Sequence, residues 1–353
     1  MAETSLEGVS LEELQLAARN HGMPLEALRY PVTPVGLHYL LTHYDVPAVE
    51  PQIWRLTVSG ERERSLGLAE LKERPAVEVA VTMECAGNGR ARLDPRPVSQ
   101  PWLLEAVGTA RWRGAPLRPL LDEVGFEEGS VEVLLTGLDR GIEGGVEQSF
   151  QRSLPLEEAL RDEVLLAYEM NGEPLPPQHG FPLRLVVPGW YGMTNVKWLE
   201  RIELIDRPFG GYQQAQSYRV RQNEDEEGEP LSRMRPRSLF VPPGIPEFLT
   251  RDRTVAAGDV VLEGRAWSGC APVASVEVSA DGGASWTAAE LDPPGAKWAW
   301  RGWRYAWQAE PGGYVLCSRA RDEAGNEQPL DPPWNLGGYA NNAVQRVAVI
   351  VTG

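Results

Sequence analysis

The feature that most limits the fold of this chain is an abrupt change of pattern at residues 221–247. This segment contains the acidic run Asn223-Glu-Asp-Glu-Glu-Gly-Glu, the basic run Arg233-Met-Arg-Pro-Arg, and the proline-rich run Val241-Pro-Pro-Gly-Ile-Pro. Charge blocks and prolines of this kind are typical of a linker or an extended crossing segment. A chain divided in this way is expected to form two domains, as its 353 residues also suggest at roughly 150 residues per domain.

Before this segment the pattern predicts a mixture of helices and strands. Residues 10–20 predict a short amphipathic helix, because Ser10 and Glu13 are spaced as a capping box and Gly22 follows as a stop. Residues 54–59 and 77–82 alternate with period two, and 183–187 form a short apolar run bounded by proline, so each predicts a strand. Residues 154–170 predict a helix. Together they indicate an α+β domain.

After the segment the pattern is purely that of strands. Residues 275–279, the turn Asp281-Gly-Gly and Trp286 predict a hairpin, and further strands are expected at 303–308, 314–320 and 344–351. The 36 glycines and 30 prolines of the chain suit such turn-rich structure. We expect a β-sandwich of roughly a hundred residues at the end of the chain.

Charge and cysteine content narrow the possible partners. The chain has 34 Lys and Arg against 50 Asp and Glu, a net charge of −16, which repels nucleic acid and anionic membrane surfaces. We found no apolar run long enough to span a bilayer, and the first seven residues show neither an export signal nor a twin-arginine leader. Three widely spaced cysteines form no evident disulfide framework or zinc cluster. These features predict a cytoplasmic protein.

Residues 82–90, Thr-Met-Glu-Cys-Ala-Gly-Asn-Gly-Arg, follow a predicted strand and allow three interpretations. A dinucleotide-binding loop would need a third small residue where Arg92 stands, and Pro95 and Pro97 prevent a long helix. Cys85 could be a buried apolar residue before a glycine turn. It could also be a single thiolate ligand of a soft metal, with backbone amides and Arg90 forming an anion-binding rim. Spacing alone does not separate the last two.

Residues 179–198 place His179, Arg184 and Lys197 on or around one strand and the glycine loop after it. This set suits the binding of a phosphate or a polyanion. The alternative is a solvated strand edge, which is common for charged residues.

Taken together, these segments resemble the sulfite oxidase family of molybdenum enzymes. The resemblance rests on Glu84-Cys-Ala-Gly-Asn, Gly108-Thr-Ala-Arg-Trp112, residues 179–198, and Trp334-Asn-Leu with Asn341-Asn342. It implies an α+β molybdopterin-binding fold followed by an immunoglobulin-like β-sandwich that mediates dimerisation. We therefore expect an N-terminal helical extension at 1–30, a molybdopterin-binding oxidoreductase domain at 31–235 and an immunoglobulin-like dimerisation domain at 236–353.

The resemblance also assigns roles to individual residues. Cys85 matches the cysteine that ligates molybdenum, Arg90 matches a substrate-binding arginine, and Trp102 matches a tryptophan of the substrate pocket. Residues expected to bind the pterin or its phosphate are His43, Asp139, His179, Arg184, Asn195 and Lys197. His38 has no match in the family pattern, so we expect it to be structural.

The substrate pocket departs from the sulfite-oxidising pattern. Leu41 stands in place of an arginine, Phe150 in place of a tyrosine, and the arginine expected from the C-terminal domain falls near Ala271. Arg111, Arg113 and Arg152 lie near these motifs in sequence and could compensate in part. A doubly charged oxyanion needs several charge-assisted hydrogen bonds, so a less charged substrate becomes credible.

The sequence thus predicts a homodimeric molybdenum oxidoreductase that transfers an oxygen atom to or from a small anionic or oxo substrate, sulfite remaining possible. The resemblance implies a molybdopterin without a nucleotide. A haem signature is absent from the sequence and it has only four histidines, so the electron carrier is expected to be a separate cytochrome or small redox carrier. Two alternatives are a reductase of S-oxides, N-oxides or nitrate, and a non-catalytic dimeric remnant that binds pterin.

Overall fold

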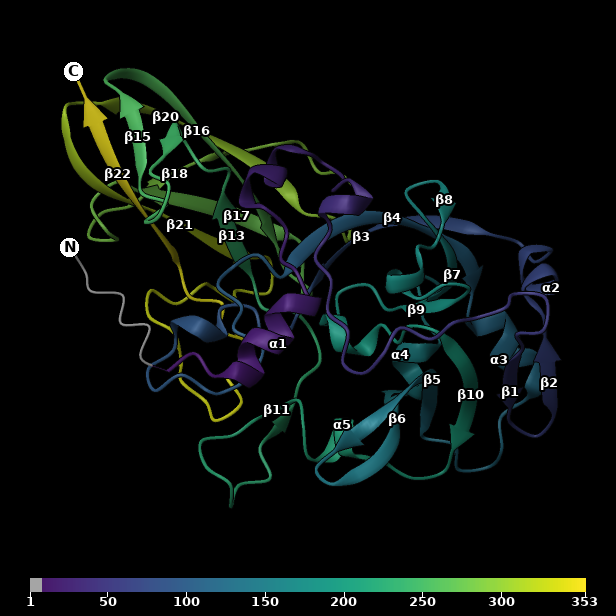
Figure 1. Ribbon diagram of the computed structural model, residues 1–353. Helices are drawn as coiled ribbons and strands as arrows, with labels where there is room; N and C mark the ends of the chain where they lie inside the picture. The colour runs from purple at the N-terminus through teal and green to yellow at the C-terminus, as the bar shows by residue number, and fades with distance from the viewer. Residues whose placement is uncertain (1–7) are drawn as a thin grey trace.

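The computed structural model describes residues 8–353, and Figure 1 shows an N-terminal α+β part beside a C-terminal part built of strands. Residues 1–7, for which the sequence showed no export signal, lie outside the described residues. No helix between residues 8 and 353 combines the length and the apolar character needed to cross a lipid bilayer. The α-helices are short: α1 (Leu11–Arg19), α2 (Leu68–Lys72), α3 (Arg118–Val124), α4 (Leu156–Ala159) and α5 (Tyr212–Ala215).

Two sheets form the N-terminal part. The first has the strand order β2-β1-β10-β5-β6, and the second has the order β3-β4-β7-β8 with β9 paired to β7. The strands of the first sheet are β1 (Leu56–Ser59), β2 (Glu63–Leu66), β5 (Glu132–Glu143), β6 (Val146–Pro155) and β10 (Leu199–Ile205). Those of the second are β3 (Val77–Glu84), β4 (Val107–Pro116), β7 (Leu165–Met170), β8 (Glu173–Pro174) and β9 (Arg184–Val186). Short 3₁₀ turns lie at Leu25–Arg29, Val35–Leu37, Arg90–Arg92, Pro177–His179 and Gly192–Thr194.

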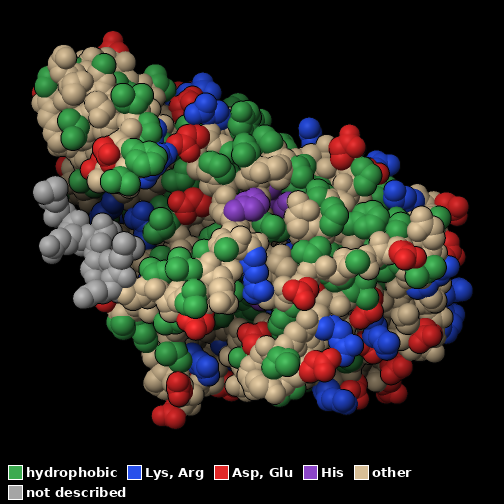
Figure 2. Space-filling model, in the orientation of Figure 1, with side chains coloured by type: hydrophobic (Ala, Val, Ile, Leu, Met, Phe, Trp, Pro, Cys, Tyr) green, Lys and Arg blue, Asp and Glu red, His purple; other side chains and the backbone are tan. Residues whose placement is uncertain are grey.

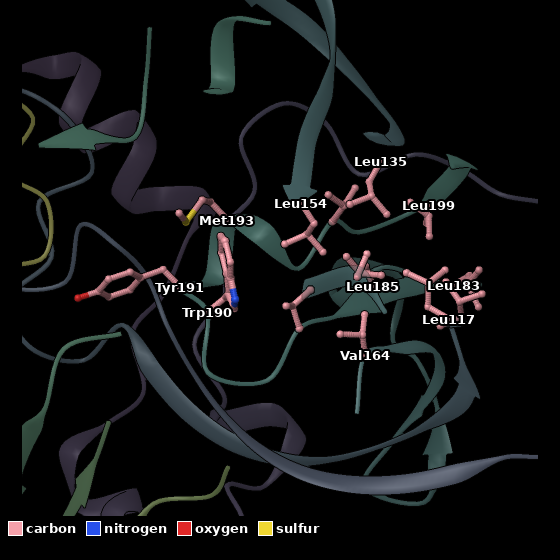
Figure 3. Close-up of a cluster of buried hydrophobic side chains, with 14 of the residues drawn as sticks. Leu117, Leu135, Leu154, Val164, Leu183, Leu185, Trp190, Tyr191, Met193 and Leu199 are labelled. Atoms are coloured by element: carbon pink, nitrogen blue, oxygen red, sulfur yellow. The ribbon is translucent and has the colours of Figure 1, made fainter. Parts of the chain in front are cut away.

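Between these sheets lies the larger hydrophobic core. Figure 3 shows its leucines converging, with Leu135 and Leu154 on one side and Leu183 and Leu185 on the other. The predicted strands at 77–82 and 183–187 are present as β3 and β9. A separate small cluster surrounds Cys85 at the C-terminal end of β3.

The C-terminal part is a pair of facing sheets. One has the order β13-β16-β20-β19 and the other β14-β15-β22-β21-β17-β18. Their strands are β13 (Arg237–Phe240), β14 (Ile245–Pro246), β15 (Arg253–Ala256), β16 (Gly258–Trp267), β17 (Val273–Ser279), β18 (Thr287–Ala288), β19 (Glu290–Leu291), β20 (Arg301–Ala309), β21 (Gly312–Asp322) and β22 (Gln345–Thr352). Phe240 and Trp303 pack edge to face at 5.1 Å in the core between the two sheets. The expected immunoglobulin-like sandwich is therefore present. A small hairpin, β11 (Arg219–Val220) and β12 (Glu229–Pro230), lies in the crossing segment.

The predicted helix at 154–170 is wrong. The region consists of the end of β6, the single-turn helix α4 and the strand β7. β7 pairs with β4 on one side and β9 on the other, and Leu165, Leu166 and Ala167 are all fully buried. A strand buried on both faces loses the alternating pattern that would identify it, so its apolar run resembled a helix. The predicted helix at 10–20 is present as α1, with the Ser10–Glu13 capping box formed.

Both parts of the molecule meet along β3. The amide of Thr82 donates to the carbonyl of Trp298 at 2.8 Å, and Figure 1 shows β3 running alongside the C-terminal strands. The carboxylate of Glu84 contacts two residues of the C-terminal sheet, with Oε1 2.9 Å from Nε of Arg237 and Oε2 accepting from Nε1 of Trp267 at 2.9 Å. The residue before Cys85 is therefore fixed by both parts of the chain.

Candidate active site

Cys85 begins the loop that leaves β3. Its amide donates to the carbonyl of Ala106 at 2.9 Å, and its carbonyl accepts from the amide of Asn88 at 2.9 Å. Asn88 in turn donates to Glu84 and accepts from the amide of Ala106, so a buried amide side chain holds the loop shut. Gly89 has φ +91°, a left-handed conformation that disfavours other residues. The loop therefore holds the Cys85 thiol in one place, 6% exposed.

Cys85 lines a cavity between residues of the N-terminal part. All six residues predicted to bind the cofactor lie on its wall together with Cys85, although the six come from three separate stretches of the chain: His43, Asp139, His179, Arg184, Asn195 and Lys197. The structure thus brings the whole predicted set into one cavity. His38 also lines it, which the sequence did not indicate.

Two buried cations, Arg184 and Lys197, line this cavity. Arg184 donates to the carbonyls of His179 and Asn195 at 3.0 and 3.1 Å, and Nζ of Lys197 donates to the carbonyls of Leu41 and Gln178 at 2.9 and 3.0 Å. Neither forms a salt bridge with any carboxylate of residues 8–353. Burial lowers the pKa of Arg184 to about 10. Burial and the nearby Arg184 charge lower the pKa of Lys197, an effect that the Asp139 carboxylate partly offsets. Arg184, which has no such carboxylate, leaves a positive charge that favours an anion in the cavity.

The three histidines of the cavity are neutral at physiological pH. Burial lowers the pKa of His38 to about 4, that of His43 to about 3 and that of His179 to about 2. Nδ1 of His38 lies 3.0 Å from the carbonyl of Tyr39, whereas its Nε2 is buried without a partner. These rings therefore offer hydrogen-bond donors and acceptors rather than charges.

Asn195 and Asp139 differ in what they can offer a ligand. The Asn195 side chain is used by the protein, accepting from the amide of Val187 at 2.7 Å and donating to the carbonyl of Tyr191 at 3.2 Å. Asp139 instead has a buried oxygen, Oδ1, with no partner, and burial raises the pKa of this carboxyl. Asn195 thus supports the wall, while Asp139 is available to a ligand.

A second cavity adjoins the first. The three residues predicted to be catalytic, Cys85, Arg90 and Trp102, all line it. Arg90 donates through Nε to the carbonyl of Gly337 at 2.9 Å and through Nη1 to Oγ of Ser99 at 2.8 Å. Among residues 8–353 the Arg90 guanidinium has no carboxylate in salt-bridge range. Leu41, His43, Cys85 and Tyr218 line both cavities, so the thiol lies where the two spaces meet.

The departures from the family pattern can now be placed. Leu41 lies on both cavity walls, and the ring of Phe150 is 4.7 Å from that of His43. Ala271 lines a different cavity, with Arg161 and Arg233. The C-terminal part reaches the second cavity through Tyr339 instead. The sequence pointed to this segment only through the nearby Trp334-Asn-Leu and Asn341-Asn342 motifs.

Of the three arginines that could compensate, two lie elsewhere. Arg111 and Arg113 are exposed on β4, 3.9 Å from Glu78 and 3.5 Å from Glu169. Arg152 is buried beneath the site, with its guanidinium 5.6 Å from the ring centroid of Tyr218. Figure 2 shows acidic and basic side chains interspersed over one face of the molecule.

These residues fit a metal carried by an anionic organic cofactor. Within residues 8–353 no three His, Cys, Asp or Glu side chains converge as a metal site, so a metal at Cys85 would take its other ligands from a cofactor. Four residues that line one or other of the two cavities carry buried polar atoms without partners: His38 Nε2, Trp102 Nε1, Asp139 Oδ1 and Arg184 Nε. A ligand rich in heteroatoms and carrying a phosphate would satisfy them.

Two family models match the chain. Residues 43–213 match an oxidoreductase molybdopterin-binding domain, and residues 232–352 match a Mo-co oxidoreductase dimerisation domain. The chain is 39% identical to sulfite oxidase of Gallus gallus, covering 89% of this chain and 72% of that protein. It is 37% identical to mitochondrial sulfite oxidase of Homo sapiens, over 91% of this chain and 62% of the relative, and 32% identical to an NADH nitrate reductase of Oryza sativa, over 91% and 38%.

Among solved structures, the sulfane dehydrogenase SoxCD of Paracoccus pantotrophus is similar along the whole chain. The TM-score is 0.81 at 25% identity, covering 100% of this chain and 95% of that one. This likeness extends over both parts of the molecule. The chain therefore belongs to the sulfite oxidase family of molybdopterin-binding oxidoreductases.

Proposed function

We propose that the cavity lined by Arg184 and Lys197 holds the molybdopterin and that the adjoining one admits the substrate of an oxygen-atom transfer. One observation carries this proposal: the Cys85 thiol lies where a cavity with two buried cations that form no salt bridge in the described residues meets a second cavity containing Arg90. When bound, the cofactor supplies a two-electron change at the metal coupled to oxygen-atom exchange. The chain supplies binding, orientation and exclusion of water.

In this proposal each group has a separate task. Cys85 ligates the metal, Arg184 and Lys197 hold the cofactor's phosphate, and the neutral His179 and the partly neutralised Asp139 hydrogen bond to its heteroatoms. We propose a pterin without a nucleotide. Arg90 orients an anionic or polarised oxygen of the substrate, and Trp102, with its unpartnered Nε1, forms a wall of the pocket.

The substrate we propose carries less charge than sulfite. Leu41 and Phe150 offer no hydrogen bond where the family pattern has an arginine and a tyrosine, and each charge-assisted bond lost costs about 1.5–3 kcal/mol. Arg90 supplies the guanidinium of the substrate cavity. A single cation suits a monoanion or a polarised neutral oxide, so reduction of nitrate, an S-oxide or an N-oxide is our second candidate.

We further propose a homodimer formed through the C-terminal domain, which matches a dimerisation domain. The boundaries we propose are 31–235 and 236–353, preceded by the extension at 1–30. Electrons would pass to or from a separate cytochrome or small carrier, with no haem in this chain.

The experiment that tests this function is metal and pterin analysis of protein from a cofactor-competent host. We expect about one molybdenum per chain and a pterin fluorescent after oxidation. Both should be lost in Cys85→Ala and retained in Cys270→Ala, whose exposed thiol lies outside both cavities. A folded wild-type protein without metal or pterin would favour the non-catalytic alternative. Loaded protein would justify a substrate screen from sulfite to nitrate and organic S-oxides, in both directions.

A further inference from the structure

The second cavity contains an acidic side chain as well as Arg90. Glu143 lines it from the last position of β5, at the tip of the β5–β6 hairpin. Its carboxylate oxygen Oε2 accepts a hydrogen bond from Oη of Tyr44 at 3.1 Å and another from Nε2 of Gln213. Both donors use the same oxygen, and among residues 8–353 no group donates to Oε1. One oxygen of the carboxylate therefore remains for a ligand.

The two opposite charges of this cavity do not compensate each other. Among residues 8–353 no Lys, Arg or His nitrogen lies within 4.0 Å of the Glu143 carboxylate. Arg140, three residues before it on β5, pairs with Glu147 instead. The Arg90 guanidinium has a carbonyl and a hydroxyl as its hydrogen-bond partners. A cavity lined by an unpaired cation and an unpaired anion is complementary to a ligand that carries both charges.

Gln213 adds a hydrogen-bond acceptor beside Glu143. It lies on α5, which Figure 1 shows next to β6, and it lines the same cavity although it is only 2% exposed. Its Nε2 donates to Oη of Tyr44 at 3.1 Å as well as to Glu143, whereas its Oε1 is buried without a partner. Buried acceptors are rarely left without a donor, and a ligand with N–H groups would supply one. A protonated amine has three such donors and no acceptor.

The hairpin that carries Glu143 is fixed against its surroundings. The ring of Tyr44 packs on Gly141, where a Cβ would lie 2.2 Å from the ring carbon Cδ1. Nη1 of the buried Arg152 donates to the carbonyl of Gln213, so α5 is attached to β6. The two acceptors are therefore held in place before a ligand binds, which reduces the entropic cost of binding.

We propose that the second cavity binds a zwitterionic substrate, with Glu143 and Gln213 accepting hydrogen bonds from its protonated amine. Arg90 then binds the oxide or oxyanion at the other end of the molecule, beside Cys85. The substrate class is an S-oxide, N-oxide or sulfur oxyanion that also carries an amine. This inference rests on the proposed function, which places the substrate in this cavity. It concerns recognition and adds no step to the transfer of the oxygen atom.

Pairs of sulfonates that differ in one charge test the proposal. Aminoalkanesulfonates with two, three or four carbons between the charges carry the ammonium group, and the corresponding hydroxyalkanesulfonates carry a neutral hydroxyl in its place. Calorimetric titration is carried out on the purified protein, whose molybdenum and pterin contents are measured first. The part of the binding that Arg90→Met abolishes reports on the second cavity. For at least one chain length we expect the ammonium compound to bind about tenfold more tightly than its hydroxyl counterpart.

Glu143→Gln removes the charge and keeps the shape of the side chain. We expect it to abolish the preference for the ammonium compound and to strengthen binding of the hydroxyl compound about twofold, because a negative charge has left the cavity. Glu143→Asp keeps the charge and should retain part of the preference. Glu147→Gln is the matched control, since this carboxylate lies on the same hairpin but is about two-thirds exposed and lines neither cavity. Its preference should equal that of wild type.

The opposite results are equally definite. Equal binding of both members of every pair by the wild type, or binding of neither, would overturn the proposal. A preference that survives Glu143→Gln would also overturn it, as would weaker binding of both members in that variant, because a merely structural carboxylate would behave in that way. A wild type that contains no molybdenum or pterin would instead refute the proposed function, and that result comes from the metal and pterin analysis alone.

Discussion

Arg237 and Arg184 are both almost completely buried, yet their surroundings differ. Nε of Arg237 lies 2.9 Å from Glu84, whose other oxygen accepts from Trp267. Arg184 has carbonyls and the Met83 sulfur as partners but no carboxylate. Arg237 is therefore charge-paired within the chain and connects the two parts of the molecule, although Nε of each arginine and Nη1 of Arg237 form no hydrogen bond. Arg184 leaves a charge that a ligand must neutralise, so the comparison distinguishes a structural cation from a binding one.

The largest change in stability is expected from breaking the buried ion pair between Arg237 and Glu84. Glu84→Gln keeps the shape but leaves the Arg237 charge uncompensated, and removing one partner of a buried pair costs about 3–5 kcal/mol. The free energy of unfolding, measured in urea for the transition that separates the two parts, should fall by that amount. A loss below about 1 kcal/mol would show that the pair is not the structural element described here.

Substitution of Arg184, which has no carboxylate partner, should affect stability in the opposite way. Arg184→Met removes an unpaired buried charge, so the cofactor-free protein should be unchanged or more stable by about 1–2 kcal/mol. Its pterin and molybdenum content should nevertheless fall at least tenfold, because the anion loses its partner. Cofactor-free protein is the necessary reference. Strong destabilisation of that form would place Arg184 with Arg237 among the structural cations.

The free energy of unfolding should depend on pH because the histidines of this cavity are buried. The pKa of His38 falls from 6.5 to about 4 on burial, so below pH 6.5 the unfolded chain binds a proton that the folded one does not. Stability therefore decreases as the pH falls, by about 1–2 kcal/mol for this group between pH 8 and pH 5. The pH dependence should be shallower in His38→Gln by that amount. An unchanged difference between pH 8 and pH 5 would mean that the ring is charged in the folded state.

These differences show where sequence reasoning succeeds and where it fails. Local signals identified α1, through its capping box, and the strands of the sandwich, through their alternation and turns. The helix predicted at 154–170 failed because β7 pairs with β4 and β9 at its two edges and is buried on both faces, so pairing in the sheet decides its conformation. Residues in recognisable motifs, such as Cys85 and Arg184, were found from the sequence alone.

The residues that sequence reasoning missed have no local signature. His38 joins the site because its ring packs against Gly108, where a Cβ would approach its ring carbon to 2.6 Å. Tyr218 and Tyr339 meet across 121 positions of sequence, brought together where the C-terminal segment lies on the Cys85 loop. Only tertiary packing supplies such contacts. A single sequence can therefore suggest the ligating residues but not the residues that pack beside them and hold them in position.

The smallest change in stability is expected from the exposed ion pair Arg140–Glu147, whose N–O distance equals that of Arg237–Glu84. Nη2 of Arg140 lies 2.9 Å from Oε1 of Glu147, matching the separation between Arg237 and Glu84, but both side chains are about two-thirds exposed. Water screens the attraction and both partners remain solvated after either is removed, so Arg140→Ala should change the free energy of unfolding by less than about 0.5 kcal/mol. Urea unfolding at low and high salt provides the measurement. A loss near that of Glu84→Gln would mean that distance alone governs these pairs, whereas the expected difference of several kcal/mol assigns the effect to burial.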